Sequence, residues 1–457
     1  MQYETLFQSA TERPVRAALL GCGEFGLSLI AQAGRTLGLR IVAALDRDPA
    51  RVAASLAAAG QPYRRCASLA DARAAEVGGE IALCERLDDL LGIAPEIAVE
   101  ATGDAEAAVV HALACLAAGV GVAMVSKEAE CVVGPALAAR ARAAGLAWTL
   151  VDGDQPALLI GLVSWARTLG LPVIAGGKSS EYDFVFDPAD GTTRWLDMAV
   201  DAPAVGQHWA LAADTAATLA ARAGLLAALP QRTVPDFCEM ALVANATGLL
   251  PDRADFHAPL ARTPELAEIF GPRAAGGVLA NSGVLDVFNC LRRPDEASFA
   301  GGVFVVVGLA DRRTGDLLAG KGIPVSRDRM RAMIYNPSHL LGVEAPISVM
   351  AAARLGHSII NADYGQRVDL VARVSRDLPA GHVLAIEGTR HAVPGLEAAL
   401  APAEPVRAGT TIPYYMAVGR RLSRAVPAGT VLRVDDVEAP SASALWALRQ
   451  EGDIALR

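Results

Sequence analysis

The glycine-rich segment GCGEFG, residues 21–26, is the pattern whose spacing points most directly to chemistry. It follows a short apolar run and precedes a helical pattern. In such a loop the first glycine permits a tight turn, the second lets the backbone approach a pyrophosphate, and the third allows close packing of helix on strand. The free N–H groups of the helix then face the phosphates. We therefore expect a dinucleotide-binding loop made of Gly21, Gly23, Glu24, Phe25 and Gly26.

Further cofactor contacts are expected where the next apolar runs end. Asp46 closes the second run, where a carboxylate would bind the ribose hydroxyls, and Arg47 beside it could pair with a 2′-phosphate. The pattern is compatible with NADP or NAD. Thr102 and Gly103 close the third run, and ligands of an open parallel sheet lie at the carboxyl ends of its strands. These two residues are therefore expected to flank the nicotinamide ribose.

Two lysines are candidates for the reaction itself. Lys127 follows the fourth apolar run at the same sheet edge, where it would orient a cofactor or substrate oxygen or else be solvated. Lys178 follows a Gly-Gly pair at the end of a predicted strand, where an ammonium could protonate or polarise a carbonyl. Asp154 and Gln155 follow the fifth run, which places them beside the nicotinamide as a catalytic and a substrate-binding candidate. Asp154 is also suited to cap the helix that follows.

A second group of candidates lies around a predicted helix that begins near residue 235. Glu239 is a catalytic candidate, and Arg232 and Asn245 are substrate-binding candidates that could face the same pocket. Asp236 and Glu239 have an alternative role, because acids in the first turn of a helix interact favourably with its dipole.

The elements that position these residues predict an α/β protein. Five apolar runs alternate with helical patterns up to residue 160, which indicates a doubly wound parallel sheet of the Rossmann type. The segment 64–91 is expected to decorate its edge. We expect an α+β catalytic domain over 161–338, a helix returning to the first domain over 339–364, and a small β-rich module over 365–457. In that module LPAG at 378–381 recurs as VPAG at 426–429.

Composition excludes several classes of protein. A net charge of -9 argues against general nucleic-acid binding, which needs a basic surface. The seven cysteines lack CxxC spacing, so neither a disulfide framework nor a metal site is predicted. Without a leader pattern or an uncharged membrane-length apolar run, the chain is expected to be cytoplasmic and without a membrane partner. Clusters of arginine near 292 and 329 would favour an anionic substrate if they line the cleft.

Several longer motifs resemble one family of enzymes. They are GDQP at 153–156, PDFCEM at 235–240 continuing to ANATG at 244–248, PSHLLGVEAP at 337–346, and the repeated tail. With the glycine loop, they make the chain similar to homoserine dehydrogenase-like oxidoreductases with a C-terminal SAF domain, and more narrowly to the deoxyxylulose-phosphate reductoisomerase-like enzymes.

This resemblance implies an NAD(P)-dependent oxidoreductase, assembled as a homo-oligomer (dimer or tetramer), that acts on a small, phosphorylated sugar or polyol derivative. It also implies that Lys127 and Lys178 bracket the substrate. Two alternatives stay open: a homoserine-type dehydrogenase of an amino acid semialdehyde, and a nicotinamide-binding lyase or sensor without net redox chemistry.

Overall fold

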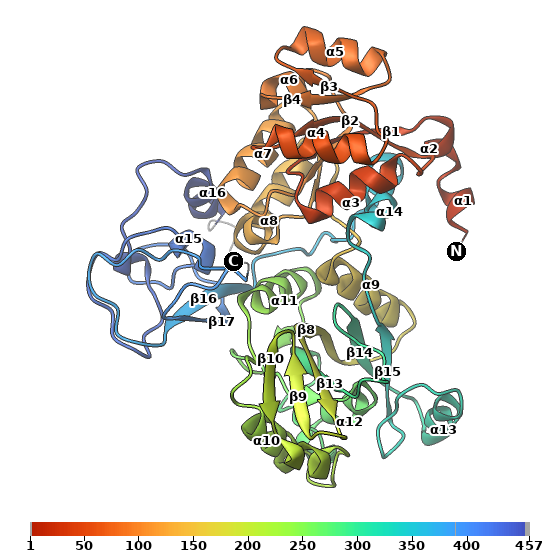
Figure 1. Cartoon of the computed structure of the whole chain (residues 1–457), viewed down its shortest axis with the longest axis vertical. Helices are drawn as coiled ribbons and strands as arrows, with labels where there is room; N and C mark the ends of the chain where they lie inside the picture. Colours follow the sequence, from red (N-terminus) through yellow and green to blue (C-terminus); the bar gives the residue numbers. More distant parts are fainter. Residues whose placement is uncertain (1, 389, 453–457) are drawn as a thin grey trace.

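The computed structural model describes residues 2–388 and 390–452, and it arranges them in three lobes (Figure 1). The first lobe is built on a parallel sheet of seven strands in the order β3-β4-β2-β1-β5-β6-β7. Its strands are β1 (Val15–Leu20), β2 (Leu39–Leu45), β3 (Tyr63–Cys66), β4 (Ile81–Cys84), β5 (Ile97–Glu100), β6 (Gly121–Met124) and β7 (Trp148–Leu150). The predicted α/β class is confirmed.

Helices connect these strands and cover the sheet, as parallel strands with apolar residues on both faces require. They are α3 (Glu24–Ala33), α4 (Pro49–Ala58), α5 (Leu69–Val77), α6 (Leu87–Leu91), α7 (Ala105–Ala117) and α8 (Lys127–Ala143); two short helices, α1 (Tyr3–Leu6) and α2 (Gln8–Glu12), precede them. The next helix, α9 (Gln155–Thr168), follows β7 and packs against the second lobe. The segment 64–91 is more regular than expected. It carries most of β3 and all of β4, and these two strands extend the sheet beyond β2.

The second lobe is a mixed sheet centred on one long strand. That strand, β8 (Val173–Asp187), pairs with β13 in parallel and with β14 and β9 in antiparallel register. The sequence-based expectation that this strand ends at Lys178 is therefore wrong. The reason is that the polar residues beyond Lys178 are also paired and largely buried, which a reading of apolar runs does not detect. The other strands are β9 (Thr192–Trp195), β10 (Met198–Asp201), β11 (Leu250–Pro251), β12 (Leu260–Ala261), β13 (Val284–Arg292), β14 (Val303–Gly308) and β15 (Arg331–Asn336).

Helices of the second lobe lie on both sides of the mixed sheet. They are α10 (Thr215–Leu225), α11 (Val234–Thr247), α12 (Leu266–Ile269) and α13 (Arg312–Gly320). The helix that matters for the site is α11, which lies between the second lobe and the first (Figure 1). Twelve of its fourteen residues are buried, because it contacts α8, α9 and β8 as well as the third lobe.

The chain then returns to the first lobe. The helix α14 (Ala345–Met350) continues into a π-helical turn, η5 (Ala351–Leu355), and packs against α3 and β7. Just before it, the backbone N–H of Gly342 donates to Ser28 Oγ of α3 at 3.0 Å. Val349 lies in the same apolar cluster as Leu29.

The third lobe contains the repeated segment, and the two copies pair with each other. It holds β16 (Val368–Val374), β17 (Leu396–Pro402), α15 (Tyr414–Ala417) and α16 (Ala444–Gly452). Leu378 and Val426, which occupy equivalent positions in the two copies, exchange backbone hydrogen bonds of 3.0 and 2.9 Å. The Gly381 N–H donates to the Leu422 carbonyl at 2.8 Å, and its counterpart Gly429 donates to Val374 at 2.7 Å. The repeat thus forms a local two-fold unit.

The third lobe is anchored to the first through α16. The carboxylate of Glu106, in the first turn of α7, accepts hydrogen bonds from Ser443 Oγ at 2.5 Å and from the Ala444 N–H at 2.6 Å. Buried Arg449 binds Asp369 and donates to the Val132 carbonyl of α8 at 3.0 Å. Over residues 2–388 and 390–452, no helix is both long enough and apolar enough to cross a membrane.

Candidate active site

The glycine loop connects β1 to α3, and each of its glycines has a distinct environment. Gly21 has a φ of +88°, and a Cβ there would lie 2.7 Å from the backbone of Ala101. At Gly26, in the first turn of α3, a Cβ would lie 2.5 Å from the Gly21 carbonyl oxygen. Nothing lies within 4 Å of the Cβ position at Gly23. The loop is therefore closely packed on the protein side and open at the residue expected to face a pyrophosphate.

A cavity of about 990 Å³ lies beside this opening. Its lining includes Gly21, Gly23, Asp46, Arg47 and Thr102. Among the other predicted cofactor residues, Glu24 and Phe25 lie in the first turn of α3 outside this lining, and Gly103 lines an adjoining cavity. The size and the open backbone fit an extended dinucleotide.

Asp46 is braced against the glycine loop. One oxygen of its carboxylate accepts from the Cys22 N–H at 2.6 Å, and the other accepts from the Asp48 N–H at 2.8 Å. Arg51 lies 3.4 Å from the same carboxylate. Arg47 is exposed on the cavity rim. The site therefore combines a carboxylate held by backbone donors with an adjacent guanidinium group.

Five charged side chains form a continuous series of alternating sign, which we call the charge chain. It consists of Asp154, Lys127, Glu239, Lys178 and Asp236. Lys127 Nζ lies 3.1 Å from Asp154 Oδ2 and also contacts Glu239 Oε1. Lys178 Nζ contacts Glu239 Oε2 and lies 2.8 Å from Asp236 Oδ1. The catalytic candidates Lys127, Asp154, Lys178 and Glu239 are thus brought together.

Local structure explains why these side chains converge. Lys127 is the first residue of α8, and Asp154 is the N-cap of α9, where its carboxylate accepts from the Gln155 N–H at 2.9 Å. Asp236 and Glu239 are three residues apart on α11 and therefore share one helix face. Lys178 extends from β8 toward that face.

The next residue on the same face of β8 closes the series. Ser180 alternates with Lys178 along the strand, so the two side chains point the same way. Its hydroxyl donates to Asp236 Oδ2 at 2.6 Å. We did not predict Ser180, although the two-residue spacing from Lys178 was available once the strand was known to continue. From the sequence alone, Asp236 has only the expected role of a helix-dipole partner. Its three-residue spacing from Glu239 indicates that the two acids share one helix face.

The charge chain holds its lysines in the ammonium form. Burial alone would lower the pKa of Lys127, but the carboxylates of Asp154 and Glu239 outweigh it and raise that pKa well above its usual value. The same balance between burial and the carboxylates of Asp236 and Glu239 raises the pKa of Lys178. Burial opposes ionisation of Glu239, yet the two ammonium groups lower its pKa to about 2.

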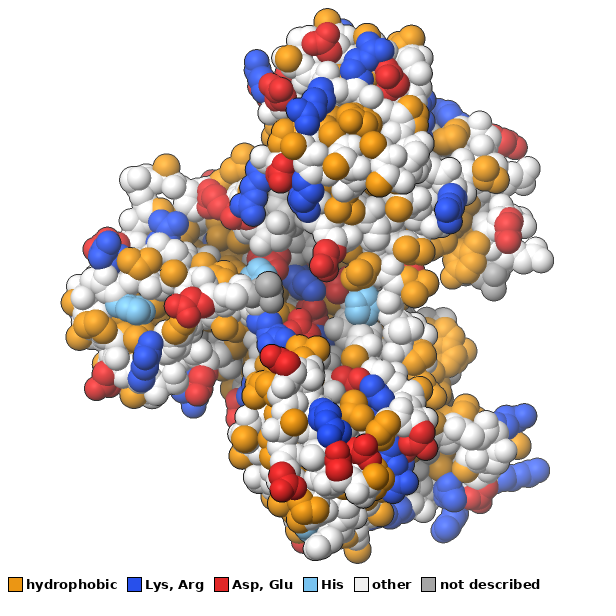
Figure 2. Space-filling view, viewed as in Figure 1, with side chains coloured by type: hydrophobic (Ala, Val, Ile, Leu, Met, Phe, Trp, Pro, Cys, Tyr) orange, Lys and Arg blue, Asp and Glu red, His pale blue; other side chains and the backbone are white. Residues whose placement is uncertain are grey.

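The two lysines differ in their access to the cleft. The side chain of Lys127 is 24% exposed and that of Asp154 is 19% exposed, whereas Lys178 is 1% exposed. Figure 2 shows the hollow between the lobes with acidic and basic side chains at its floor. The Lys127 end of the charge chain is therefore its accessible end, and the Lys178 end is enclosed by protein.

Of the three predicted substrate-binding residues, Gln155 adjoins Asp154 at the accessible end, but its side chain is bonded to protein. Buried Gln155 donates from Nε2 to the carbonyls of Ser179 and Gly302, both at 3.1 Å, and so ties α9 to the second lobe. Asn245 is fully buried, and its Oδ1 accepts from the Arg367 and Val368 N–H groups at 2.8 and 3.0 Å. Its amide is satisfied by the backbone that leads into β16, so the expectation that Asn245 contacts substrate is corrected.

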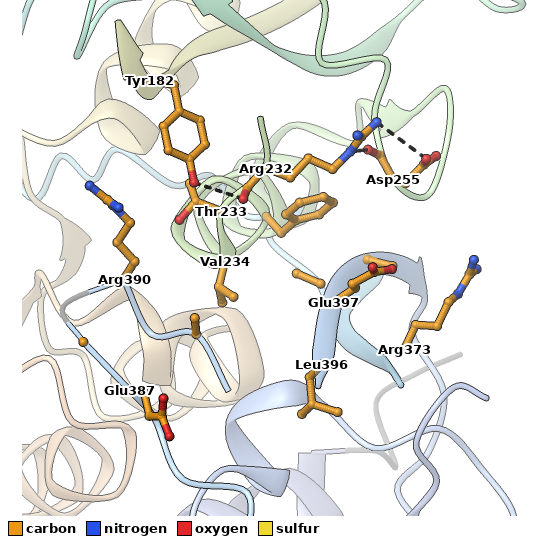
Figure 3. Close-up of a pocket in the computed structure, with 15 residues that line it drawn as sticks. Tyr182, Arg232, Thr233, Val234, Asp255, Arg373, Glu387, Arg390, Leu396 and Glu397 are labelled. Atoms are coloured by element: carbon orange, nitrogen blue, oxygen red, sulfur yellow. Dashed lines mark hydrogen bonds and ion pairs between the residues drawn. The ribbon is translucent and has the colours of Figure 1, made fainter. Parts of the chain in front are cut away.

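Arg232 lines a different cavity, of about 720 Å³, between the second and third lobes (Figure 3). Its Nε donates to the Asp255 carbonyl at 3.0 Å, and its own carbonyl accepts from the Tyr182 hydroxyl at 3.1 Å. Figure 3 shows Arg232 on the wall opposite Arg390. Arg232 precedes α11, and its guanidinium contacts Asp255 and Phe256 instead of the charge chain. Its predicted place in one pocket with Glu239 is therefore also corrected.

The arginine clusters are engaged elsewhere in the second lobe. Arg292 lies 2.9 Å from Asp183, and Arg331 lies 3.0 Å from Asp328. Over the described ranges, 2–388 and 390–452, no group of three or more His, Cys, Asp or Glu side chains is arranged to hold a metal ion.

Comparison with known proteins adds a family for the central part of the chain. Residues 153–345 match the family described as oxidoreductase DRL, catalytic domain. No curated protein sequence matches the chain. The chain therefore joins a Rossmann-type dinucleotide fold to a segment similar to an oxidoreductase catalytic domain.

Solved structures with similar arrangements come from several enzymes. The WlbA dehydrogenase of Bordetella pertussis, in complex with NADH and UDP-GlcNAcA, is 19% identical over 39% of this chain and 50% of its own, with a TM-score of 0.27. This chain thus spans half the length of that protein. The 1-deoxy-D-xylulose 5-phosphate reductoisomerase of Zymomonas mobilis, in complex with NADPH, is 15% identical over 75% and 82% of the two chains, with a TM-score of 0.31. A dihydrodipicolinate reductase from Paenisporosarcina, with dipicolinate bound, is 12% identical over 74% and 94%, with a TM-score of 0.34.

Proposed function

We propose that this protein is an NAD(P)-dependent oxidoreductase that transfers hydride between a nicotinamide and a carbonyl or carbinol carbon of a small, phosphorylated sugar or polyol derivative. The observation that carries the proposal is the charge chain, whose accessible ammonium group lies at the carboxyl edge of a sheet that also carries an open glycine loop. The match of residues 153–345 to an oxidoreductase catalytic domain supports it. Its narrowest form is a reaction like that of the 1-deoxy-D-xylulose 5-phosphate reductoisomerases.

The cofactor would be held mainly by the first lobe. Gly23 and the first residues of α3 would bind the pyrophosphate through backbone N–H groups. Gly21 and Gly26 would shape the loop by close packing, since the Gly21 N–H already donates to the Leu45 carbonyl at 2.9 Å. Asp46 and Arg47 would receive the adenosine ribose or its 2′-phosphate. Thr102, whose hydroxyl donates to Glu100 Oε1 at 2.6 Å, would flank the nicotinamide ribose from a fixed position. When bound in its reduced form, the nicotinamide supplies the hydride.

The charge chain would supply electrostatic stabilisation for the reaction. As a carbonyl is reduced, negative charge develops on its oxygen, and a preorganised cation stabilises that charge best where water is excluded. Lys127 is placed for this role because its ammonium group is the accessible one. Lys178 then acts through Glu239: it fixes the carboxylate that, together with Asp154, orients Lys127. This division of roles is a proposal that follows from their different burial.

The proposal is tested with purified protein and a panel of substrates. Consumption of NADPH or NADH is followed by absorbance with 1-deoxy-D-xylulose 5-phosphate, other sugar phosphates and aspartate semialdehyde. We expect turnover with a phosphorylated sugar. Turnover with the semialdehyde alone would instead identify a homoserine-type dehydrogenase. Binding of nicotinamide without turnover on any member would favour a lyase or sensor and contradict the proposal.

Substitution of the two lysines tests their roles. We expect Lys127→Ala and Lys178→Ala each to lower turnover at least about 100-fold, because each removes part of the preorganised electrostatic site. Cofactor affinity, measured by fluorescence titration, should change little, since neither lysine lines the cofactor cavity. Wild-type turnover in Lys178→Ala would remove that residue from the mechanism, and wild-type turnover in Lys127→Ala would overturn the assignment of the accessible lysine.

A further inference from the structure

The third lobe places a histidine beside the start of α8, next to the accessible end of the charge chain. His391 lies in the segment between β16 and β17, and its Nε2 is 3.6 Å from Glu128 Oε1. Glu128 directly follows Lys127 in the first turn of α8. The side chain of the preceding residue, Arg390, contacts the second lobe instead. It lies 3.2 Å from Glu181 and 4.5 Å from the centre of the Trp195 ring. This short segment therefore contacts both other lobes at the cleft.

His391 is held in an uncommon backbone conformation. Its φ is +54°, in the left-handed region that side chains other than glycine rarely adopt. The surrounding residues maintain it: the Tyr414 hydroxyl donates to the His391 carbonyl at 2.8 Å and accepts from the Val393 N–H at 3.1 Å. The Tyr415 ring packs edge-on against the imidazole at 5.8 Å. A residue other than glycine with a positive φ is energetically unfavourable, so this conformation persists only where the surrounding fold enforces it. Such positions concentrate at functional sites.

The other imidazole nitrogen has no partner among the described residues. Nδ1 of His391 is buried and has no hydrogen-bond partner within residues 2–388 and 390–452. The ring borders a cavity of about 280 Å³ that Gly103 and Asp104 also line. These residues form the turn after β5, which we expect to flank the nicotinamide ribose. A buried nitrogen without a partner loses the free energy of a hydrogen bond, and an oxygen of a bound ligand would restore it.

From this geometry we propose that His391 hydrogen-bonds the reacting oxygen of the substrate and, together with Glu128, transfers the proton that accompanies hydride transfer. The active site would then be composite, with the third lobe supplying the proton-transfer residue. This inference rests on the proposed function and deepens it, because the lysines of the charge chain are held as ammonium groups by their carboxylates and serve poorly as proton carriers.

The proposed step moves one hydride to carbon and one proton to oxygen. The carbonyl carbon gains the hydride of the reduced nicotinamide, and the electron pair of the C=O π bond moves to the oxygen. That oxygen takes a proton from His391 Nδ1, while Nε2 takes a proton from the carboxyl group of Glu128. The carbon is reduced, the nicotinamide is oxidised, and Glu128 is left as a carboxylate that regains its proton from water. The reverse sequence serves oxidation of a carbinol.

The surroundings of the pair suit exchange of a proton near neutrality. Burial, helped by the charge of Lys127, lowers the pKa of His391, although the carboxylate of Glu181 opposes the shift. Burial raises the pKa of Glu128 to about 7 against the opposing charge of Lys127. The first lobe presents Lys127, Asp154 and Glu100 to this pair, with Cys131 and Cys238 beside Glu128. The other charged and titratable groups that face it are Glu181 of β8, Tyr415 of α15, and Asp104, Glu106 and Arg420 across the small cavity.

The test uses His391→Gly, which removes the imidazole and tolerates a φ of +54°. We expect turnover to fall about 100-fold, as for loss of a general acid–base group. Imidazole added to the buffer should restore part of that turnover, which a merely structural role would not explain. The part of the pH dependence of turnover that is due to His391 and Glu128 should also be lost. His382→Gln, in the same lobe, is the matched control and should behave as wild type. Unchanged turnover in His391→Gly, or no rescue by imidazole, would overturn the inference.

A second measurement does not depend on turnover. Diethyl pyrocarbonate modifies accessible neutral histidines, and peptide mass analysis reports each site separately. NADPH at ten times its dissociation constant should slow modification of His391 about tenfold, because it occupies the adjoining turn, and should leave His382 unaffected. If the wild-type protein turns over no member of the panel, the proposed reaction fails. In that case equal rates of modification of His391 with and without NADPH would overturn the placement of His391 at the cofactor site. A slower rate with NADPH would support that placement.

Discussion

The cofactor cavity and the charge chain lie beside each other in the cleft, but the polypeptide builds them in different ways. The cavity depends on backbone: glycines that pack closely or leave space, and a carboxylate held by N–H groups. Most of its residues follow three neighbouring strands of one sheet. The charge chain depends on side chains that come from α8, the α9 N-cap, β8 and α11, across two lobes.

The difference predicts different sensitivities. In the cavity, a methyl group added at a glycine takes space that the cofactor needs. It lowers the stability of the protein only where it meets backbone atoms. In the charge chain, removal of one charge leaves its neighbours buried without a partner, and that penalty reaches both the stability and the chemistry. The cavity should therefore separate binding from stability, whereas the charge chain should couple stability to catalysis.

The largest effect is expected for Glu239→Gln, at the centre of the charge chain. Glutamine keeps the shape but leaves the ammonium groups of Lys127 and Lys178 without their shared carboxylate. We expect the free energy of unfolding to fall by about 3 kcal/mol, as for removal of one partner of a buried ion pair. Turnover should fall at least about 100-fold. Urea unfolding and steady-state kinetics measure the two quantities, and a change in only one would contradict the coupling.

The same variant has a characteristic dependence on pH. The pKa of Glu239 is lowered to about 2 in the folded protein, whereas an unfolded glutamate titrates near 4.3. The carboxylate therefore contributes stability that is fully present above about pH 4.3 and is lost as the pH falls toward about 2. The difference in unfolding free energy between wild type and Glu239→Gln should shrink over that interval. A difference that stayed constant down to the lower limit would show that charge is not its source.

An intermediate effect is expected from a matched pair of glycine variants in the cavity. In Gly26→Ala the new Cβ meets the Gly21 carbonyl oxygen at 2.5 Å, so the free energy of unfolding should fall by about 1–3 kcal/mol. In Gly23→Ala the Cβ meets nothing within 4 Å, so the free energy of unfolding should change by less than about 0.5 kcal/mol.

The two glycine variants should also differ in what they do to the cofactor. At Gly23 the methyl enters the space expected for the pyrophosphate, and a fluorescence titration should show NADPH affinity reduced by about tenfold or more, equal to about 1.4 kcal/mol. Undiminished binding by Gly23→Ala, with its stability intact, would place the pyrophosphate elsewhere.

The smallest effect concerns the choice between NADP and NAD. Arg47 is exposed on the cavity rim, while Asp46 is already engaged by the Cys22 and Asp48 N–H groups. We expect Arg47→Ala to weaken NADPH binding about tenfold, the loss of one charge-assisted hydrogen bond, and to leave NADH binding within about twofold. Isothermal titration with both cofactors measures this ratio. An equal loss for the two would show that Arg47 does not contact a 2′-phosphate.

The parts of the fold that could be predicted are those coded by contiguous residues. The glycine loop, Asp46 and the alternation of strands and helices are local patterns, because each depends on neighbours in the chain and on the periodicity of one element. The repeat at Leu378 and Val426 was visible for the same reason. Prediction failed at β8, where a strand continues through buried polar residues, and at Asn245, where the helix face that was guessed contacts the third lobe.

The kinds of residue in the site, and the segments that carry them, can be recognised in the sequence: the glycine loop, two lysines and the acids of α11. Their partners and their access to the cleft depend on how remote segments pack together. Lys127 and Glu239 are separated by 112 positions along the chain and meet because α8 packs against α11. The enclosure of Lys178 and the approach of His391 have the same cause. Burial and distance between remote segments set the charge state and accessibility of a side chain, and no local pattern encodes them.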